Sequence, residues 1–107
     1  MGKREAEKIV KEFGKALIKH GIPIEHLIIY GSYARGMVRP DSDIDVAVVS
    51  GKFGKDKTEE GMLLFRIAGE IDARIEPVPI SPAAYEHDTW IPLIYEIKKH
   101  GLKLKIA

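Results

Sequence analysis

Cysteine is absent from the 107 residues, and this absence removes several kinds of chemistry at once. Without thiols there is no disulfide framework, no thiolate nucleophile and no zinc–thiolate site. No apolar run approaches the ~20 residues that a membrane span requires, so we expect no membrane association. The charged N-terminus contains no apolar signal-peptide core, which predicts a cytoplasmic protein.

Neither sign of charge dominates. The chain has 17 basic and 16 acidic residues and a formal net charge of +1. No overall field would therefore attract nucleic acid, which is not an expected partner, and any phosphate recognition has to be local. The composition is 45% hydrophobic and 31% charged, which excludes disorder. This length suits one compact core and is too short for two ordinary domains, so we expect a single domain over residues 1–107.

Hydrophobic periodicity predicts helices that alternate with short strands. The expected helices cover residues 3–20, 58–69 and 90–100, with a further helical stretch opened by Ser81-Pro82; the expected strands cover 27–30, 43–50, 73–80 and 102–106. Pro77 and Pro79 predict that the third strand lies at a sheet edge. The fold class is α/β (α+β), one mixed β-sheet of about four strands with helices packed on it. For the helix over 58–69 we expect an apolar face made of Met62, Leu63, Phe65 and Ile67.

The segment from Tyr30 to Gly36, Tyr-Gly-Ser-Tyr-Ala-Arg-Gly, has the features of a phosphate-binding turn. Glycine after a strand lets the backbone approach a bulky anion, and a helical turn starting at Ser32 would direct N–H groups and a hydroxyl at it. The spacing of a Walker loop is missing. Arg35 is expected to neutralise phosphate charge, whereas for Arg39 a phosphate contact and a solvated loop position remain equally open.

Two acidic residues follow closely at Asp43 and Asp45. Because they are two positions apart on an expected strand, both carboxylates should project to the same side. Their mutual repulsion is relieved by a hard divalent cation, and Mg²⁺ is usually held by one or two carboxylates together with substrate phosphates. A phosphate turn beside this pair therefore predicts a site for Mg²⁺ and a nucleoside triphosphate.

These two motifs together resemble a known family. Gly31-Ser32-Tyr33-Ala34-Arg35-Gly36, followed by Ser42-Asp43-Ile44-Asp45-Val46, is similar to the Gly-Ser and Asp-x-Asp signature of the DNA polymerase β-like nucleotidyltransferase superfamily. The resemblance is greatest to its minimal, single-domain branch, the antitoxin-type proteins that are often paired with a helical HEPN-domain partner. It covers essentially the whole chain in length and element order.

The resemblance implies Mg²⁺-dependent transfer of a nucleoside monophosphate, AMP from ATP or the equivalent from another NTP, to an acceptor hydroxyl. A tyrosine of a HEPN toxin is the implied acceptor. In the family a third carboxylate on a later strand completes the metal site, and we choose Glu76 for it, with Asp72 as the alternative. The family more often has aspartate there. The expected catalytic residues and metal ligands are thus Asp43, Asp45 and Glu76, and the expected nucleotide-binding residues are Gly31, Ser32 and Arg35.

Two other functions remain open. One is a non-catalytic nucleotide-binding antitoxin that neutralises its partner by occlusion, which the small size favours because no further domain remains for a second substrate. The other is transfer to a small molecule such as an aminoglycoside, although related enzymes carry additional domains. The proline-interrupted strand and the aromatic-rich C-terminal segment leave an edge and an apolar surface, so we also expect a homo-oligomer or a helical partner.

Overall fold

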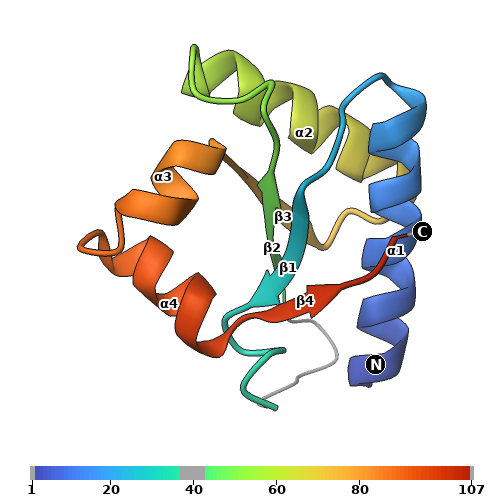
Figure 1. The fold of residues 1–107 in the computed structure, drawn as a ribbon. Coiled ribbons are helices and arrows are strands. Elements are labelled where there is room, and N and C mark those ends of the chain that lie inside the picture. The colour runs from blue at the N-terminus through green and yellow to red at the C-terminus, as the bar shows by residue number, and fades with distance from the viewer. Residues whose placement is uncertain (1, 37–42, 107) are drawn as a thin grey trace.

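The computed structural model describes residues 2–36 and 43–106, in which helices and strands follow the expected order (Figure 1). Arg39, Asp41 and Ser42 lie outside the described residues. The elements are α1 (Lys3–Lys19), β1 (His26–Tyr30), β2 (Ile44–Val49), α2 (Lys57–Ile71), β3 (Ile75–Ile80), α3 (Pro82–His87), α4 (Pro92–His100) and β4 (Leu102–Leu104). Within this part of the chain, no helix combines the length and the apolar content that crossing a membrane requires.

The four strands form one mixed sheet in the order β3-β2-β1-β4. The central strand β1 is antiparallel to both β2 and β4, whereas β2 and β3 are parallel. The register places Tyr30 of β1 opposite Asp45 of β2, and Asp45 opposite Glu76 of β3. The predicted mixed sheet of about four strands is confirmed, and three residues of chemical interest lie in one row across it.

Helices cover both faces of the sheet, with α1 and α2 on one side and α3 and α4 on the other (Figure 1). Val46 and the other even-numbered residues of β2 pack against the first pair, where Phe13 of α1 is fully buried. Ala47 and Val49 pack against the second pair, where Ile97 of α4 is buried. Because both faces of β2 are covered, nearly all of this strand is apolar, as expected for a central strand.

The predicted apolar face of α2 is confirmed for Ile67 and Leu63, which pack in the core cluster, and is wrong for Met62 and Phe65. Met62 and Phe65 are 68% and 52% exposed, while the residues that α2 buries are Leu64, Ile67 and Ala68. These three recur at helical spacing and therefore share one side of the helix, from which Met62 and Phe65 are rotated away. The last helix also begins later than predicted, at Pro92, which leaves Trp90 in the preceding loop, 78% exposed.

The start of α2 is set by two acidic side chains rather than by Thr58. The Asp56 carboxylate accepts a hydrogen bond from the N–H of Glu59 at 3.1 Å and so caps the helix. The Glu60 carboxylate reaches back to accept from the N–H groups of Gly54, Lys55 and Asp56 at 3.0 to 3.1 Å. These bonds, the one from Gly54 first, hold the pKa of Glu60 below its usual range. The loop before α2 is thereby fixed to the helix.

The prolines of β3 lie where they cost no hydrogen bond within the sheet. Ile44 N–H donates to the carbonyl of Arg74 at 2.8 Å, and Ser50 N–H donates to that of Ile80 at 3.2 Å, so the even-numbered residues of this segment face β2. The backbone nitrogens of Pro77 and Pro79 therefore point away from β2. The N–H of Ile75, which also points outward, donates to the carbonyl of Asp72 at 3.2 Å. β3 is an edge strand, as the prolines predict.

The hydrogen bonds of Glu60 predict a pH-dependent contribution to stability. Because its pKa is lowered in the folded state, the stabilisation is complete at neutral pH and is lost as the pH falls below the usual value of 4.5 and through the folded-state pKa. Allowing for solvent screening, Glu60→Gln should lower the free energy of unfolding by about 1 kcal/mol at pH 7. The unfolding free energies of wild type and variant, measured in urea, should converge as the pH falls below the folded-state pKa of Glu60. The exposed neighbour Glu59 supplies the control: a Glu59→Gln effect of equal size and pH dependence would contradict this assignment.

Candidate functional site

The predicted phosphate turn leaves β1 at Gly31 and ends at Gly36. Gly31 has a φ of +73°, and the N–H of Arg35 donates to its carbonyl at 3.2 Å, which closes a single helical turn rather than a regular helix. Tyr33 in the middle is buried in the core between the sheet and α1 and α2. In the described part of the chain the N–H of Ser32 donates to no backbone carbonyl. This is the property of a first-turn residue that can donate to an anion.

Gly31 lies directly against Asp45. A Cβ atom added at Gly31 would be 2.4 Å from Oδ2 of Asp45, so the Asp45 carboxylate would have to move to admit it. The positive φ disfavours other residue types independently of this contact. Glycine here therefore allows the phosphate turn and a carboxylate of β2 to approach more closely than any other residue would.

Three predicted acidic residues gather at this end of the sheet. Asp45 is half-buried on β2, Asp43 is exposed immediately before that strand, and Glu76 is exposed on β3 opposite Asp45. Burial and the charge of Asp43 raise the pKa of Asp45. Burial, the charge of Asp43, a side-chain hydrogen bond with Asp43 and the charge of Asp45 raise the pKa of Glu76. Each carboxylate thus lies within range of the others, and like charges disfavour ionisation.

Tyr30 borders the same cluster from β1. Its ring is half-buried and packs against the apolar cluster beneath α3 and α4. Burial, followed by the charges of Asp45 and Glu76, raises the pKa of its hydroxyl to about 12. The hydroxyl therefore stays protonated at neutral pH.

Asp72, the alternative third carboxylate, is held by a different partner. Arg74 donates to it through its backbone N–H, Nε and Nη2, at 2.9, 2.9 and 2.7 Å. The side-chain hydrogen bond from Arg74 is the main cause that lowers the pKa of Asp72. Arg74 is thereby paired with Asp72 and not with Glu76, so the geometry groups Glu76 with Asp43 and Asp45.

Arg35 forms an ion pair with a residue of α4, a contact that the sequence did not predict. Its Nη2 donates to Oε1 of Glu96 on α4, and the other oxygen of Glu96 lies 4.0 Å from Nε2 of His100. The ion pair joins the phosphate turn to α4 across 61 positions in the sequence. Glu96 had no signal in the sequence, because nothing in the periodicity of α4 separates a partner of Arg35 from an ordinary surface carboxylate.

The side chains that could coordinate the expected Mg²⁺ are carboxylates. Among residues 2–36 and 43–106, no three His, Cys, Asp or Glu side chains are arranged so that together they could hold a metal ion. The fit to Mg²⁺ rests instead on Asp43 and Asp45, since this ion usually takes one or two carboxylates and completes its coordination with water and substrate phosphates. Hard oxygen donors beside a phosphate turn match that requirement.

Known proteins are similar to this chain over nearly its whole length. Residues 3–104 match the model of the nucleotidyltransferase domain family. A protein of Methanocaldococcus jannaschii, provisionally assigned as a protein adenylyltransferase, is 27% identical over 103 residues, which are 94% of this chain and 99% of that protein. A second protein of that organism with the same provisional assignment is 48% identical over 44 residues, which are 40% of this chain and 44% of that protein.

Solved structures share the fold. A crystal structure described as a provisional nucleotidyltransferase from Sulfolobus solfataricus has a TM-score of 0.67 at 18% identity and covers 94% of this chain and 80% of its own. A crystal structure of a toxin–antitoxin with AMP-PNP has a TM-score of 0.59 at 20% identity, with 91% of this chain and 73% of that chain covered. At these identities the likeness concerns the arrangement of the elements.

The contact between Gly31 and Asp45 can be tested against a matched glycine. Gly36 has a similar φ of +79°, but a Cβ atom there would meet nothing within 4 Å. Gly36→Ala should therefore cost only the backbone strain, about 1–2 kcal/mol. Gly31→Ala adds the displacement of the Asp45 carboxylate, so its loss of unfolding free energy in urea should be clearly larger. Equal losses for the two variants would show that the close approach has no energetic consequence.

Proposed function

The chain belongs to the nucleotidyltransferase domain family, and we propose that it transfers AMP from Mg²⁺-ATP to a hydroxyl group of a protein. The observation that carries the proposal is the row formed by the turn at Gly31, Asp45 and Glu76 across β1, β2 and β3. It sets a phosphate-binding turn and acidic groups side by side at one end of the sheet. We also propose that the protein acts in the cytoplasm and uses the ATP of that compartment.

The phosphate turn would bind the triphosphate tail. The N–H and hydroxyl of Ser32 are its donors, and the fixed backbone of Gly31 keeps them at the end of β1. Arg35 would add positive charge from the same turn. The Arg35 guanidinium also forms an ion pair with Glu96, which keeps it close to α4. We therefore expect the triphosphate either to bind the guanidinium together with Glu96 or to displace Glu96 from it.

The transfer forms a bond between the acceptor oxygen and the α-phosphorus and breaks the bond from that phosphorus to the oxygen bridging to the β-phosphate. Pyrophosphate leaves with that oxygen. Glu76 would take the proton of the acceptor hydroxyl, a role that its raised pKa favours. The attacking and leaving oxygens are roughly in line in such reactions. Because the phosphate turn follows β1, the acceptor would enter from the side of β3.

Asp43 and Asp45 would hold Mg²⁺, whereas Glu76, which does not complete a three-residue metal site with them among the described residues, would act as the base. When bound, the ion supplies positive charge that offsets the negative charge of the triphosphate and of the leaving pyrophosphate. Without positive charge, the carboxylates would repel the phosphates that the neighbouring turn attracts. Burial is the first cause of the raised pKa values of Asp45 and Glu76, and the charge of Asp43 is the next.

A protein acceptor is supported by the relatives and by an exposed surface. Two relatives carry the provisional assignment of protein adenylyltransferase, and one structural neighbour is a toxin–antitoxin. Trp90, Leu93 and Tyr95 expose 78%, 38% and 51% of their surface around the start of α4. Aromatic side chains are enriched at protein interfaces. We propose a HEPN-type toxin as the partner and one of its tyrosines as the acceptor.

The same surface supports the alternative of a non-catalytic antitoxin, in which binding alone neutralises the partner. Self-association through this surface is a further possibility. Transfer of labelled AMP to the partner separates the enzyme from the binding module, because only the enzyme catalyses it.

Asp45→Asn should weaken the binding of Mg²⁺-ATP about a hundredfold, which corresponds to about 2.8 kcal/mol. The fold should survive, because the substitution removes a like charge from the cluster. Calorimetry with Mg²⁺-ATP, beside thermal unfolding of the same samples, measures both effects. Asp56→Asn, at the cap of α2 and away from the cluster, is the control. Unchanged affinity in the double variant Asp43→Asn, Asp45→Asn would contradict the metal assignment.

Glu76→Gln keeps the size of the side chain and removes its charge. Binding of Mg²⁺-ATP should be retained within a few-fold, while transfer falls by about 10²-fold or more, as expected for a group that acts mainly in the transition state. Single-turnover transfer of labelled AMP to the HEPN-type partner measures the rate. Asp72→Asn should leave that rate near the wild-type value. The reverse ranking of the two variants would assign the third carboxylate to Asp72.

A further inference from the structure

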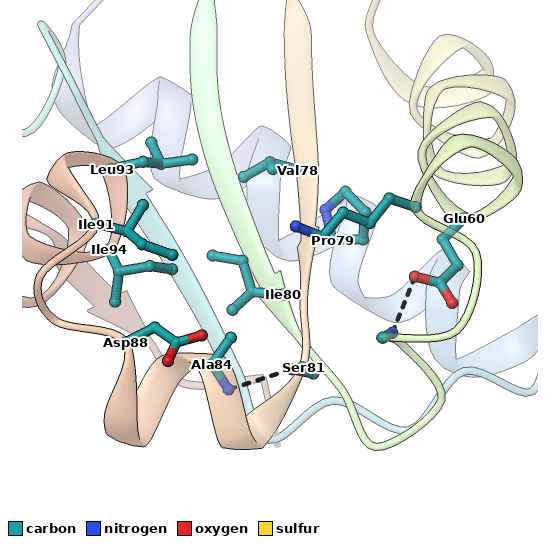
Figure 2. Close-up of a pocket in the computed structure, with 12 residues that line it drawn as sticks. Glu60, Val78, Pro79, Ile80, Ser81, Ala84, Asp88, Ile91, Leu93 and Ile94 are labelled. Carbon is teal, nitrogen blue, oxygen red and sulfur yellow. Dashed lines mark hydrogen bonds between the residues drawn. The ribbon is translucent and has the colours of Figure 1, made fainter.

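A cavity of about 290 Å³ opens between β3, the loop before α2, and helices α3 and α4 (Figure 2). Val78 and Ile80 of β3 form one wall, and Ile91 and Ile94 at the start of α4 form the opposite wall. Ala84 of α3 lies at one end between them. The cavity is mainly aliphatic, with Lys57 also in its lining, and its size is near the lower limit of pockets that bind small ligands.

The wall of the cavity at Val78 lies near the candidate site. Val78 lies two residues after Glu76 on the same side of β3, roughly 7 Å farther along the strand. Val78, Ala84 and Ile91 line the cavity and pack on the same apolar cluster as Tyr30, which borders the carboxylates. A ligand with one end at Asp45 and Glu76 could therefore extend over Val78 into the cavity without leaving this face of the sheet.

Two carboxylates line the cavity, and they differ in availability. Glu60 already accepts hydrogen bonds from three backbone N–H groups of the loop before α2. Asp88, at the end of α3, has its carboxylate toward Ala84 and the cavity interior in Figure 2. Among the described residues, no side-chain or backbone donor bonds to that carboxylate. Asp88 is thus the acceptor that a ligand in the cavity would find.

We propose that this cavity holds the nucleobase of the substrate and that Asp88 accepts a hydrogen bond from the exocyclic amino group of adenine. The inference rests on the proposed function and extends it to the choice of base. The aliphatic walls at Val78 and Ile94 contact the two faces of the ring. The carboxylate opposes bases that present a carbonyl oxygen in place of the amino group, because two acceptors would then face each other.

The path of the bound nucleotide favours the nucleobase, and not the hydroxyl-bearing acceptor, as the group that occupies the cavity. With the triphosphate tail at Ser32 and the α-phosphate near Asp45 and Glu76, the nucleoside is covalently attached at the point nearest Val78. An acceptor needs only to bring one oxygen to the phosphorus and can approach from the open side. The base is also a group that a mainly aliphatic cavity with a carboxylate free to accept a hydrogen bond accommodates.

The first test fills the cavity. Ala84→Leu places a larger side chain in it, and Ala83→Leu adds the same group at the exposed neighbouring position of α3. Calorimetry with Mg²⁺-ATP and with Mg²⁺-tripolyphosphate separates the base from the phosphates. We expect Ala84→Leu to weaken ATP about tenfold or more while tripolyphosphate is unaffected, and Ala83→Leu to change neither. Unchanged ATP affinity in a folded Ala84→Leu protein would overturn the proposal.

The second test removes the hydrogen-bond acceptor, the Asp88 carboxylate. It does not depend on how α3 tolerates leucine. Wild type should bind ATP about tenfold more tightly than purine riboside triphosphate, which lacks only the amino group, and Asp88→Ala should bring this ratio close to one. Glu86→Ala, an exposed carboxylate of the same helix, should leave the ratio unchanged. A wild-type ratio of one would overturn the role of Asp88. Normal tripolyphosphate binding beside that result would leave the proposed function intact, whereas loss of all triphosphate binding in wild type would refute both.

Discussion

The antiparallel pairing of β1 with β2 is the constraint on which the rest of the molecule depends. Both strands lie in the middle of the sheet with helices on both faces, so their register is fixed by what each face buries. A slip of one residue would turn Asp45 toward the apolar layer beneath α1 and α2 and would bring Ile44 to the candidate site. The cost of burying a carboxylate there excludes the slip. Packing of the core thereby also sets the position of Asp45 against Gly31.

Much of the fold could be predicted from the sequence because it depends on local periodicity. Alternating and helical patterns locate all four strands and the main helices, and the prolines of β3 place it at an edge. The errors arose where a side chain from outside the repeating pattern decides the outcome. Asp56 and Glu60 start α2 earlier than Thr58 would, and Pro92 delays α4 past Trp90. The buried side of α2 was partly misjudged because Met62 and Phe65 are hydrophobic but face away from the sheet.

The site could be predicted only as far as neighbours in the sequence determine it. Asp43 and Asp45 share a side of the sheet through the two-residue period of a strand, and Gly31-Ser32 follows β1 directly. The position of Glu76 beside Asp45 depends on β3 running parallel to β2, which no local pattern specifies. The partner of Arg35 on α4 and the cavity at Val78 are formed by segments far apart in the chain, so they required the structure. The chemical roles of these residues remain predictions.

The outward positions of β3 have a consequence for how this molecule can meet other chains. An exposed strand is normally a template on which a second chain can extend the sheet, and that is one route to aggregation. At its three outward positions, β3 offers two prolines and one N–H already bonded within the chain. A second strand would find carbonyl oxygens to donate to but no donor to accept from, and its ladder could not form. Recognition on this side must therefore use side chains and surface shape, and the edge beside the carboxylates stays accessible instead of being covered by a copy of itself.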